Sequence, residues 1–272
     1  MTRIFGENSM RFSKPLLIAT LAVLGFSASA HVSPALAAEA EAELPDVHWS
    51  FEGPLGTYDK AALQRGFKIY QNVCASCHSM KLLSYRNLEA LGYDEGQIKA
   101  ISSQYTVMDG PNDEGEMFER PALPSDKFKS PFENDAAAKY ANNGALPPDL
   151  SLITKAREGG AAYVYGILTG YEDAPAEWLE EHELMSGQHY NKQMPGHVIS
   201  MAPPLSDGLV AYEDGTPETL DQYAHDIATF LTWAAEPEME ERKRMGIKVV
   251  LFLIAFAGIM YAVKKRIWAK QH

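Results

Sequence analysis

The pentapeptide Cys74-Ala75-Ser76-Cys77-His78 constrains this chain more than any other stretch of its sequence. Its C-x-x-C-H pattern is typical of sites where a c-type haem is attached. At such a site the two thiols form thioethers with the porphyrin vinyl groups, and the adjacent imidazole binds the iron. The motif therefore predicts one haem c, attached through Cys74 and Cys77, with His78 as an iron ligand.

A disulfide, half of a zinc site or a thiol redox motif can use cysteines at the same spacing. Cys74 and Cys77 are the only cysteines in the chain, and no second Cys or His pair at short spacing follows them. Structural zinc usually takes four such ligands. A thioredoxin-type motif follows a strand, whereas the residues before Cys74 have helical periodicity. Haem is therefore favoured, with thiol redox chemistry or another metal as the alternatives.

Composition limits the partners and the size of the core. The 272 residues are 46% hydrophobic, which is enough for one sizeable core with large insertions. The formal net charge of -12 argues against nucleic acid as a partner. It favours a basic protein partner, since complementary fields speed encounter.

The N-terminus has the pattern of a signal peptide. Arg11 and Lys14 precede an apolar run over 16–26, and an A-x-A cleavage pattern stands at 35–37. The run is too short to span a bilayer. We therefore expect residues 1–37 to be removed during export, with a second A-x-A pattern at 28–30 as the alternative cleavage site.

A second apolar run, over residues 245–263, has basic residues on both sides. Its length matches the roughly 20 residues that a helix needs to cross a bilayer. The alternative, a buried core helix, would show polar residues along one whole face, whereas this run is interrupted only by Lys248 near its start. We expect a transmembrane helix here, with the lipid bilayer as its surroundings.

Together the two ends predict a single exported domain on one anchor. The expected segments are an exported haem domain over 38–236, a linker over 237–244, the span over 245–263 and a cytoplasmic tail over 264–272. Export of the N-terminal side places the domain in the periplasm and the anchor in a bacterial inner membrane.

Apolar periodicity and helix signals predict an all-α fold. The expected helices cover residues 59–72, 88–90, 94–105, 136–142 and 150–170, and a last one starts at Thr216-Pro217 and ends before Pro237. A helix before the haem motif and another near the end of the domain can pack across a c-type haem. The prediction is a c-type cytochrome fold with long loop insertions.

Two further segments each have two interpretations. The adjacent prolines Pro147 and Pro148 form either a rigid apolar loop that shields a haem edge or a plain turn. The acidic segment 172–183 is either a solvated face or a docking surface for a basic redox partner.

The second axial ligand decides between electron transfer and catalysis. A thioether raises the reduction potential, as a late carrier requires. Met201, followed by Ala202-Pro203-Pro204, and Met194, followed by Pro195, have similar local chemistry. The remaining candidates are Met185, His182, His189, His197 and His225.

With these residues in view, the chain resembles the cytochrome c1 family, the haem-bearing subunits of the cytochrome bc1 complex (ubiquinol-cytochrome c reductase). The resemblance runs through 65–67, 74–80, 109–112, 141–150, 156–171, 201–205 and 233–243. It implies that His78 is the proximal ligand and Met201 the distal one, so Met194 is the less favoured candidate for the distal position. It also implies that Arg157 lies near a haem propionate and that Asn142, Pro147 and Pro148 line the haem pocket.

The resemblance also implies the partners and the activity. The expected partners are cytochrome b, the Rieske iron-sulfur protein as electron donor and a soluble c-type cytochrome as acceptor. The first hypothesis is accordingly a one-electron carrier, part of an oxidoreductase complex, with no substrate catalysis at its own haem. An anchored haem enzyme such as a peroxidase, in which Met201 is displaced, and a thiol oxidoreductase without haem are the alternatives.

Overall fold

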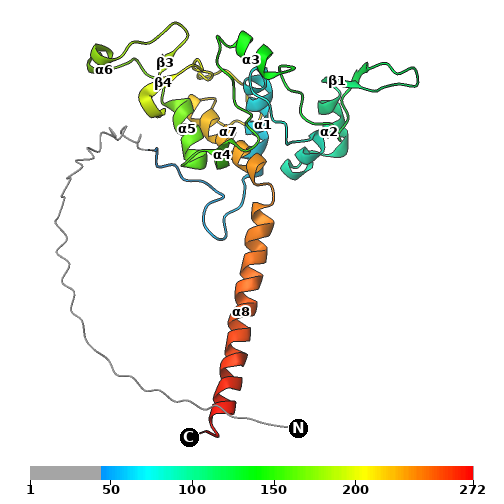
Figure 1. Ribbon diagram of the computed structural model, residues 1–272, viewed down its shortest axis with the longest axis vertical. Coiled ribbons are helices and arrows are strands. Elements are labelled where there is room, and N and C mark those ends of the chain that lie inside the picture. Colours follow the sequence, from blue (N-terminus) through cyan, green and yellow to red (C-terminus); the bar gives the residue numbers. More distant parts are fainter. Residues whose placement is uncertain (1–43, 272) are drawn as a thin grey trace, which may run out of the picture. The chain divides into compact units, whose positions relative to one another are not determined.

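The computed structural model describes residues 44–271, so the expected signal peptide over 1–37 lies outside the described residues. The described chain is mostly helical (Figure 1). Its helices are α1 Lys60–Asn72, α2 Glu95–Ser102, α3 Asp135–Ala141, α4 Ile153–Ala156, α5 Gly160–Thr169, α6 Ala176–Glu181, α7 Leu220–Ala235 and α8 Met239–Trp268, with 3-10 helices η1 Cys74–Ser76, η2 Tyr85–Leu91 and η3 Pro195–His197. Its strands are β1 Thr106–Asp109, β2 Phe118–Pro121, β3 His189–Tyr190 and β4 Val198–Ile199.

Helices α1 and α7 pack side by side at the centre of the domain (Figure 1). Gly66 of α1 lies at their closest approach, because a Cβ at this position would be 2.2 Å from the Asp226 carbonyl oxygen. The rings of Phe67 and Phe230 face each other across the same crossing, with centroids 5.7 Å apart. The missing side chain at Gly66 therefore lets the two apolar faces meet at short range.

A buried ion pair ties the same two helices together. Asp226 is fully buried, and Arg65 donates hydrogen bonds to both of its carboxylate oxygens, at 2.8 and 3.0 Å. The Tyr212 hydroxyl donates a further bond to Asp226, at 2.9 Å. Both oxygens of the carboxylate thus have donors, as a buried charge requires.

The hydrophobic core extends outward from this crossing. Aromatic rings supply much of it, including the fully buried Tyr85 and Tyr223 and the stacked or tilted set of Tyr70, Tyr85 and Phe128. Helices α4 and α5 pack against the other side of α7. The expected all-α fold with long loops is confirmed.

The single helix expected over 150–170 is wrong, because two helices occupy this range. Helix α4 ends at Ala156, and α5 starts at Gly160. Between them Gly159 has a φ of 81°, in the left-handed region that interrupts a right-handed helix.

The expected start of the last domain helix at Thr216-Pro217 is also wrong. The helix begins at Leu220, and Thr219 is its N-cap, with its hydroxyl accepting a hydrogen bond from the Gln222 N–H at 3.3 Å. Thr216 and Thr219 both suit an N-cap by residue type, but only the Thr219 side chain accepts a hydrogen bond from a free N–H of the first turn. The end of the helix at Ala235, before Pro237, agrees with the prediction.

Two small antiparallel sheets and one short helix were not predicted. Strand β1 pairs with β2, with Thr106 opposite Pro121, and β3 pairs with β4, with His189 opposite Ile199. Helix α6 lies inside the acidic segment. These pieces have at most six residues each, too few for a periodic signal.

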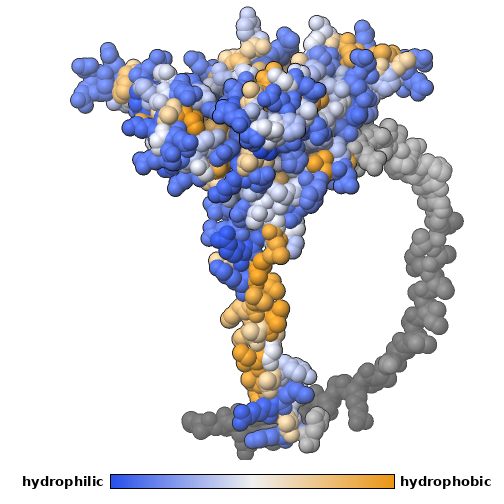
Figure 2. Space-filling view, turned by 180° about the vertical axis from the view of Figure 1, so that it is seen from behind, coloured by the Kyte–Doolittle hydropathy of each residue, from blue (hydrophilic) through white to orange (hydrophobic). Residues whose placement is uncertain are grey.

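Helix α8 has 30 residues and is long and apolar enough to cross a membrane. Figure 2 shows hydrophobic side chains along it, in contrast to the mostly hydrophilic surface of the domain. The helix begins at Met239, so residues 239–244, expected within a linker, are helical.

Hydrogen bonds bind the first turns of α8 to the loop before α1. The Tyr58 N–H donates to the Glu240 carboxylate at 2.8 Å. The Lys243 ammonium donates to the carbonyl oxygens of Phe51 and Gly56, at 2.5 and 3.1 Å. The anchor and the domain therefore share contacts beyond the single chain connection between α7 and α8.

Candidate haem-binding site

The C-x-x-C-H segment follows α1 directly and forms one tight turn. The carbonyl oxygen of Cys74 accepts hydrogen bonds from the N–H groups of Cys77 and His78, at 3.1 and 2.8 Å. Both cysteines are free and half-buried. The turn thus gathers the three residues that the motif predicts for the site.

His78 has one of its two ring nitrogens engaged by a backbone carbonyl. Its Nδ1 lies 2.8 Å from the carbonyl oxygen of Pro148. Since a carbonyl only accepts, Nδ1 carries the proton in this pair and Nε2 keeps its lone pair. Burial lowers the pKa of His78, so the ring is neutral at pH 7. A neutral imidazole with an oriented Nδ1–H is the form that binds a metal through Nε2.

A second set of hydrogen bonds fixes the Pro148 loop against the motif. The Asp149 carboxylate accepts from the Ser79 hydroxyl and from the Lys81 N–H, each at 2.9 Å. The Leu150 N–H donates to the Ser79 carbonyl at 2.9 Å. The loop that supplies the carbonyl for His78 is therefore held from the residue after Pro148.

The groups around Cys74 are uncharged. Burial raises the pKa of the Cys74 thiol to about 12. Burial also raises the pKa of Tyr70, whose hydroxyl donates to the His78 carbonyl oxygen at 3.2 Å. Two thiols and a neutral, oriented imidazole within one turn fit the attachment groups of a c-type haem.

The two competing methionines have different surroundings. Met194 is half-buried, and its sulfur accepts a hydrogen bond from the Tyr163 hydroxyl at 3.8 Å. Met201 is also half-buried, and its main chain is held by the Tyr171 hydroxyl, which donates to the Met201 carbonyl oxygen at 2.9 Å. The hydrogen bonds of residues 44–271 do not join the Met201 segment to His78.

Asn142 and Arg157 stand apart from the motif in the hydrogen-bond network. Asn142 follows the end of α3, and its amide donates to the Ala138 carbonyl at 2.7 Å, within its own helix. Arg157 follows the end of α4, is exposed and donates to the Ala156 carbonyl at 3.1 Å. The ion pairs found in the described part of the chain do not include Arg157, so its guanidinium charge is open to an acidic group.

Sequence reasoning missed three residues that hold the site in place. Asp149 stands directly after Pro148, so its position beside a predicted pocket residue was a usable signal. Tyr70 lies inside the helix expected over 59–72, and that expectation gave no indication of its bond to the His78 carbonyl. Tyr171 gave no signal, because its contact with Met201 depends on the path of the chain between them.

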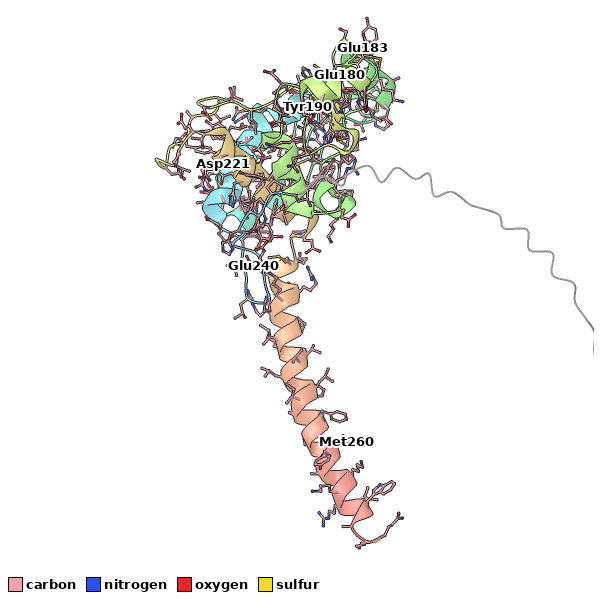
Figure 3. The ribbon with its side chains drawn as sticks, turned by 90° about the vertical axis from the view of Figure 1, so that its left-hand side faces the viewer. Glu180, Glu183, Tyr190, Asp221, Glu240 and Met260 are labelled. Atoms are coloured by element: carbon pink, nitrogen blue, oxygen red, sulfur yellow. The ribbon has the colours of Figure 1, made fainter. Side chains whose placement is uncertain are left out.

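The acidic segment 172–183 is exposed at every one of its carboxylates. Figure 3 labels Glu180 and Glu183, whose side chains lie at the outer edge of the domain. A single cation, the Lys192 ammonium at 3.5 Å, pairs with Glu172 among the described residues of this segment. The segment thus presents a largely uncompensated negative charge to solvent.

Comparison with known proteins gives matches over most of the chain. A family model described as "Cytochrome C1 family" matches residues 49–271. "Cytochrome c1" of Rhodospirillum rubrum is 45% identical over 267 residues, which cover 94% of this chain and 96% of that protein. "Cytochrome c1-2, heme protein, mitochondrial" of Solanum tuberosum is 50% identical over 245 residues, covering 90% and 91%. "Cytochrome b/c1" of Bradyrhizobium diazoefficiens is 50% identical over 249 residues, covering 84% of this chain but only 36% of that longer protein.

Proposed function

Since the chain belongs to the cytochrome c1 family, we propose that it is the haem-bearing electron-transfer subunit of a bc1 complex. It receives one electron from the Rieske iron-sulfur protein and passes it to a soluble c-type cytochrome, with cytochrome b as its neighbour in the complex. Helix α8 anchors it in a bacterial inner membrane, with the haem domain on the periplasmic side. The segments proposed for this layout are a signal peptide over 1–37 and a mature chain from residue 38.

The hydrogen bond from His78 Nδ1 to the Pro148 carbonyl, at 2.8 Å, is the observation that carries this proposal. It fixes the imidazole tautomer and leaves Nε2 for the iron. A haem bound covalently to Cys74 and Cys77 supplies a one-electron couple. The protein's part would be to hold that group through the two cysteines, His78 and Met201, and to keep water away from it.

The second ligand in the proposal is Met201. The Tyr171 hydroxyl holds its main chain, and the two prolines after it stiffen the loop. The Met194 sulfur, in contrast, already accepts a hydrogen bond from Tyr163. A thioether ligand raises the reduction potential relative to a second imidazole, which suits a carrier that reduces another cytochrome.

The remaining pocket residues have supporting roles in the proposal. In the proposal Arg157 neutralises a haem propionate, and its exposed guanidinium, which lies outside the ion pairs described above, supports this role. Pro147 and Pro148 shield the haem edge, and Asn142 ends the helix that leads into their loop. The exposed acids over 172–183 attract a basic acceptor through a field that is screened over about 8 Å at physiological ionic strength.

The test is a comparison of Met201→Leu with Met194→Leu in the full-length protein, purified with its haem. For each protein we would record the reduced-minus-oxidised spectrum, a redox titration and the response to carbon monoxide. Met194→Leu is the matched control, because it removes the same group from a loop of similar chemistry.

We expect the wild type and Met194→Leu to ignore carbon monoxide and to share one potential. Met201→Leu is expected to bind the gas and to have a much lower potential. Carbon monoxide binding by the wild type would favour the haem enzyme, and a preparation without a haem spectrum would favour the thiol oxidoreductase. An unchanged Met201→Leu would refute the assignment of the distal ligand.

A further inference from the structure

Asp149 is a carboxylate whose hydrogen bonds all come from two short segments. Its Oδ2 accepts from the Ser79 hydroxyl and the Lys81 N–H, each at 2.9 Å, and its Oδ1 accepts from the Ser151 N–H at 2.9 Å. The salt bridges of residues 44–271 give it no cation partner. A half-buried negative charge is therefore balanced by neutral dipoles alone.

Asp149 joins the segment next to His78, which supplies the Nδ1–H donor, to the segment next to Pro148, which supplies the carbonyl acceptor. Ser79 follows the histidine directly, and Asp149 follows Pro148 directly. The Leu150 N–H to the Ser79 carbonyl, at 2.9 Å, and the Leu82 N–H to the Ser151 hydroxyl, at 3.1 Å, bridge the same segments. Both bonds therefore connect residues 150–151, which follow Asp149, with residues 79–82, which follow His78.

This arrangement fixes the distance between Nδ1 and the Pro148 carbonyl from both ends. Pro148 has no N–H of its own, so its position depends on bonds made by the residues after it. Charge-assisted hydrogen bonds are stronger than neutral ones, and the Asp149 bonds are of that kind. Burial acts to raise the pKa of Asp149, but the hydrogen bonds from these donors together outweigh it, and the pKa is lowered.

We propose that Asp149 is a positioning residue for the proximal ligand. Its carboxylate clamps residues 79–81 to residues 149–151, and through this clamp it sets the strength of the His78 Nδ1–H bond to Pro148. The inference rests on the proposed function, since it takes His78 as the iron ligand. A stronger Nδ1–H bond makes the imidazole a better electron donor and favours ferric iron, so the clamp holds the potential down.

Full-length protein with its haem, in detergent micelles, provides the test. We would compare the wild type with Asp149→Asn, Ser79→Ala and Asp94→Asn. Asp94→Asn is the matched control, because Asp94 also accepts a hydrogen bond from a backbone N–H, that of Gln97 at 2.8 Å, but lies at the start of α2. The two readouts are the midpoint potential and the exchange rate of the haem-shifted His78 Nδ1 proton, followed by NMR of the 15N-histidine-labelled ferrous protein.

We expect the Nδ1 proton to exchange about ten- to hundredfold faster in Asp149→Asn and several-fold faster in Ser79→Ala. The potential is expected to rise in both variants, and Asp94→Asn is expected to match the wild type. Ser79→Ala leaves every charge in place, so a change in it cannot come from charge removal. It also serves as the test if Asp149→Asn fails to fold.

Two results would overturn the inference. One is a potential that rises in Asp149→Asn while the exchange rate of the proton stays unchanged. The carboxylate would then act on the potential only through its charge and not by positioning His78. The other is an unchanged exchange rate and potential in Ser79→Ala. Loss of haem from the wild type itself would instead refute the proposed function, so the two failures are distinguishable.

Discussion

Replacing Gly66 by alanine disturbs the crossing of α1 and α7 with a single methyl group. The new Cβ would lie 2.2 Å from the Asp226 carbonyl oxygen and 2.6 Å from the Phe230 Cβ, whereas ordinary contact begins at 3.4 Å. Neither atom can rotate away, because one belongs to the main chain and the other is bonded to it. The two helices therefore have to move apart by about 1 Å.

The cost of this separation can be set from general values. Overpacking of a core costs about 1–3 kcal/mol, and a clash with backbone atoms belongs at the upper end, about 3 kcal/mol. The higher helix propensity of alanine stabilises the folded state by about 1 kcal/mol and offsets part of this cost. The expected net loss is about 2 kcal/mol in the free energy of unfolding, which lowers the melting temperature by roughly 4–8 °C.

Thermal unfolding of the full-length protein, followed by circular dichroism, measures this loss. Gly96→Ala is the matched control, because Gly96 is an exposed position in helix α2. The nearest atom to a Cβ there is a side-chain oxygen of Asp94, at 3.2 Å, which can shift. A melting temperature for Gly66→Ala that equals that of Gly96→Ala would refute the reasoning about the crossing.

Two further predictions concern charged groups. Asp226→Ala leaves the Arg65 guanidinium without its buried counterion and the Tyr212 hydroxyl without an acceptor, so we expect a loss of about 3–5 kcal/mol in a denaturant titration; a loss under about 1 kcal/mol would contradict it. Hydrogen bonding to Arg120 holds the pKa of Asp126 below its usual value, so this carboxylate stabilises the fold at neutral pH and the contribution is lost as the pH falls below about 4. Asp126→Asn is accordingly expected to be less stable than the wild type at pH 7, with a difference that narrows in acid, whereas a difference independent of pH would count against the ion pair.

The sequence predicted the elements whose signals are local. The helix expected over 59–72 is present as α1, and the Asp59 carboxylate caps it by accepting a hydrogen bond from the Ala61 N–H at 2.9 Å. The turn of the C-x-x-C-H motif also follows from adjacent residues. Local signals were less reliable for boundaries, because the last domain helix was expected to start at Thr216-Pro217 and begins at Leu220.

The contacts that complete the site were beyond sequence reasoning because they join distant residues. The Nδ1 of His78 meets a carbonyl 70 residues later in the chain, and Tyr171 holds Met201 from 30 residues away. Arg65 and Asp226 are 161 residues apart. A backbone carbonyl gives no residue-type signal, so the Pro148 contact could be predicted only as a loop near the pocket and not as a partner of Nδ1.

The short connection between α7 and α8 has a consequence for how partners approach. Only three residues, 236–238, separate the two helices, and Glu236 pairs with Lys155 of α4 on one side and with Arg242 of α8 on the other. Lys243 is also hydrogen-bonded to the loop before α1, so the domain is joined to its anchor at several points and not only through the chain connection. Under the proposed function, a rotation or tilt of α8 in the bilayer would be transmitted through these contacts to the surface that meets the soluble acceptor. In that proposal, lipid thickness and composition would affect the rate at which the domain meets its acceptor.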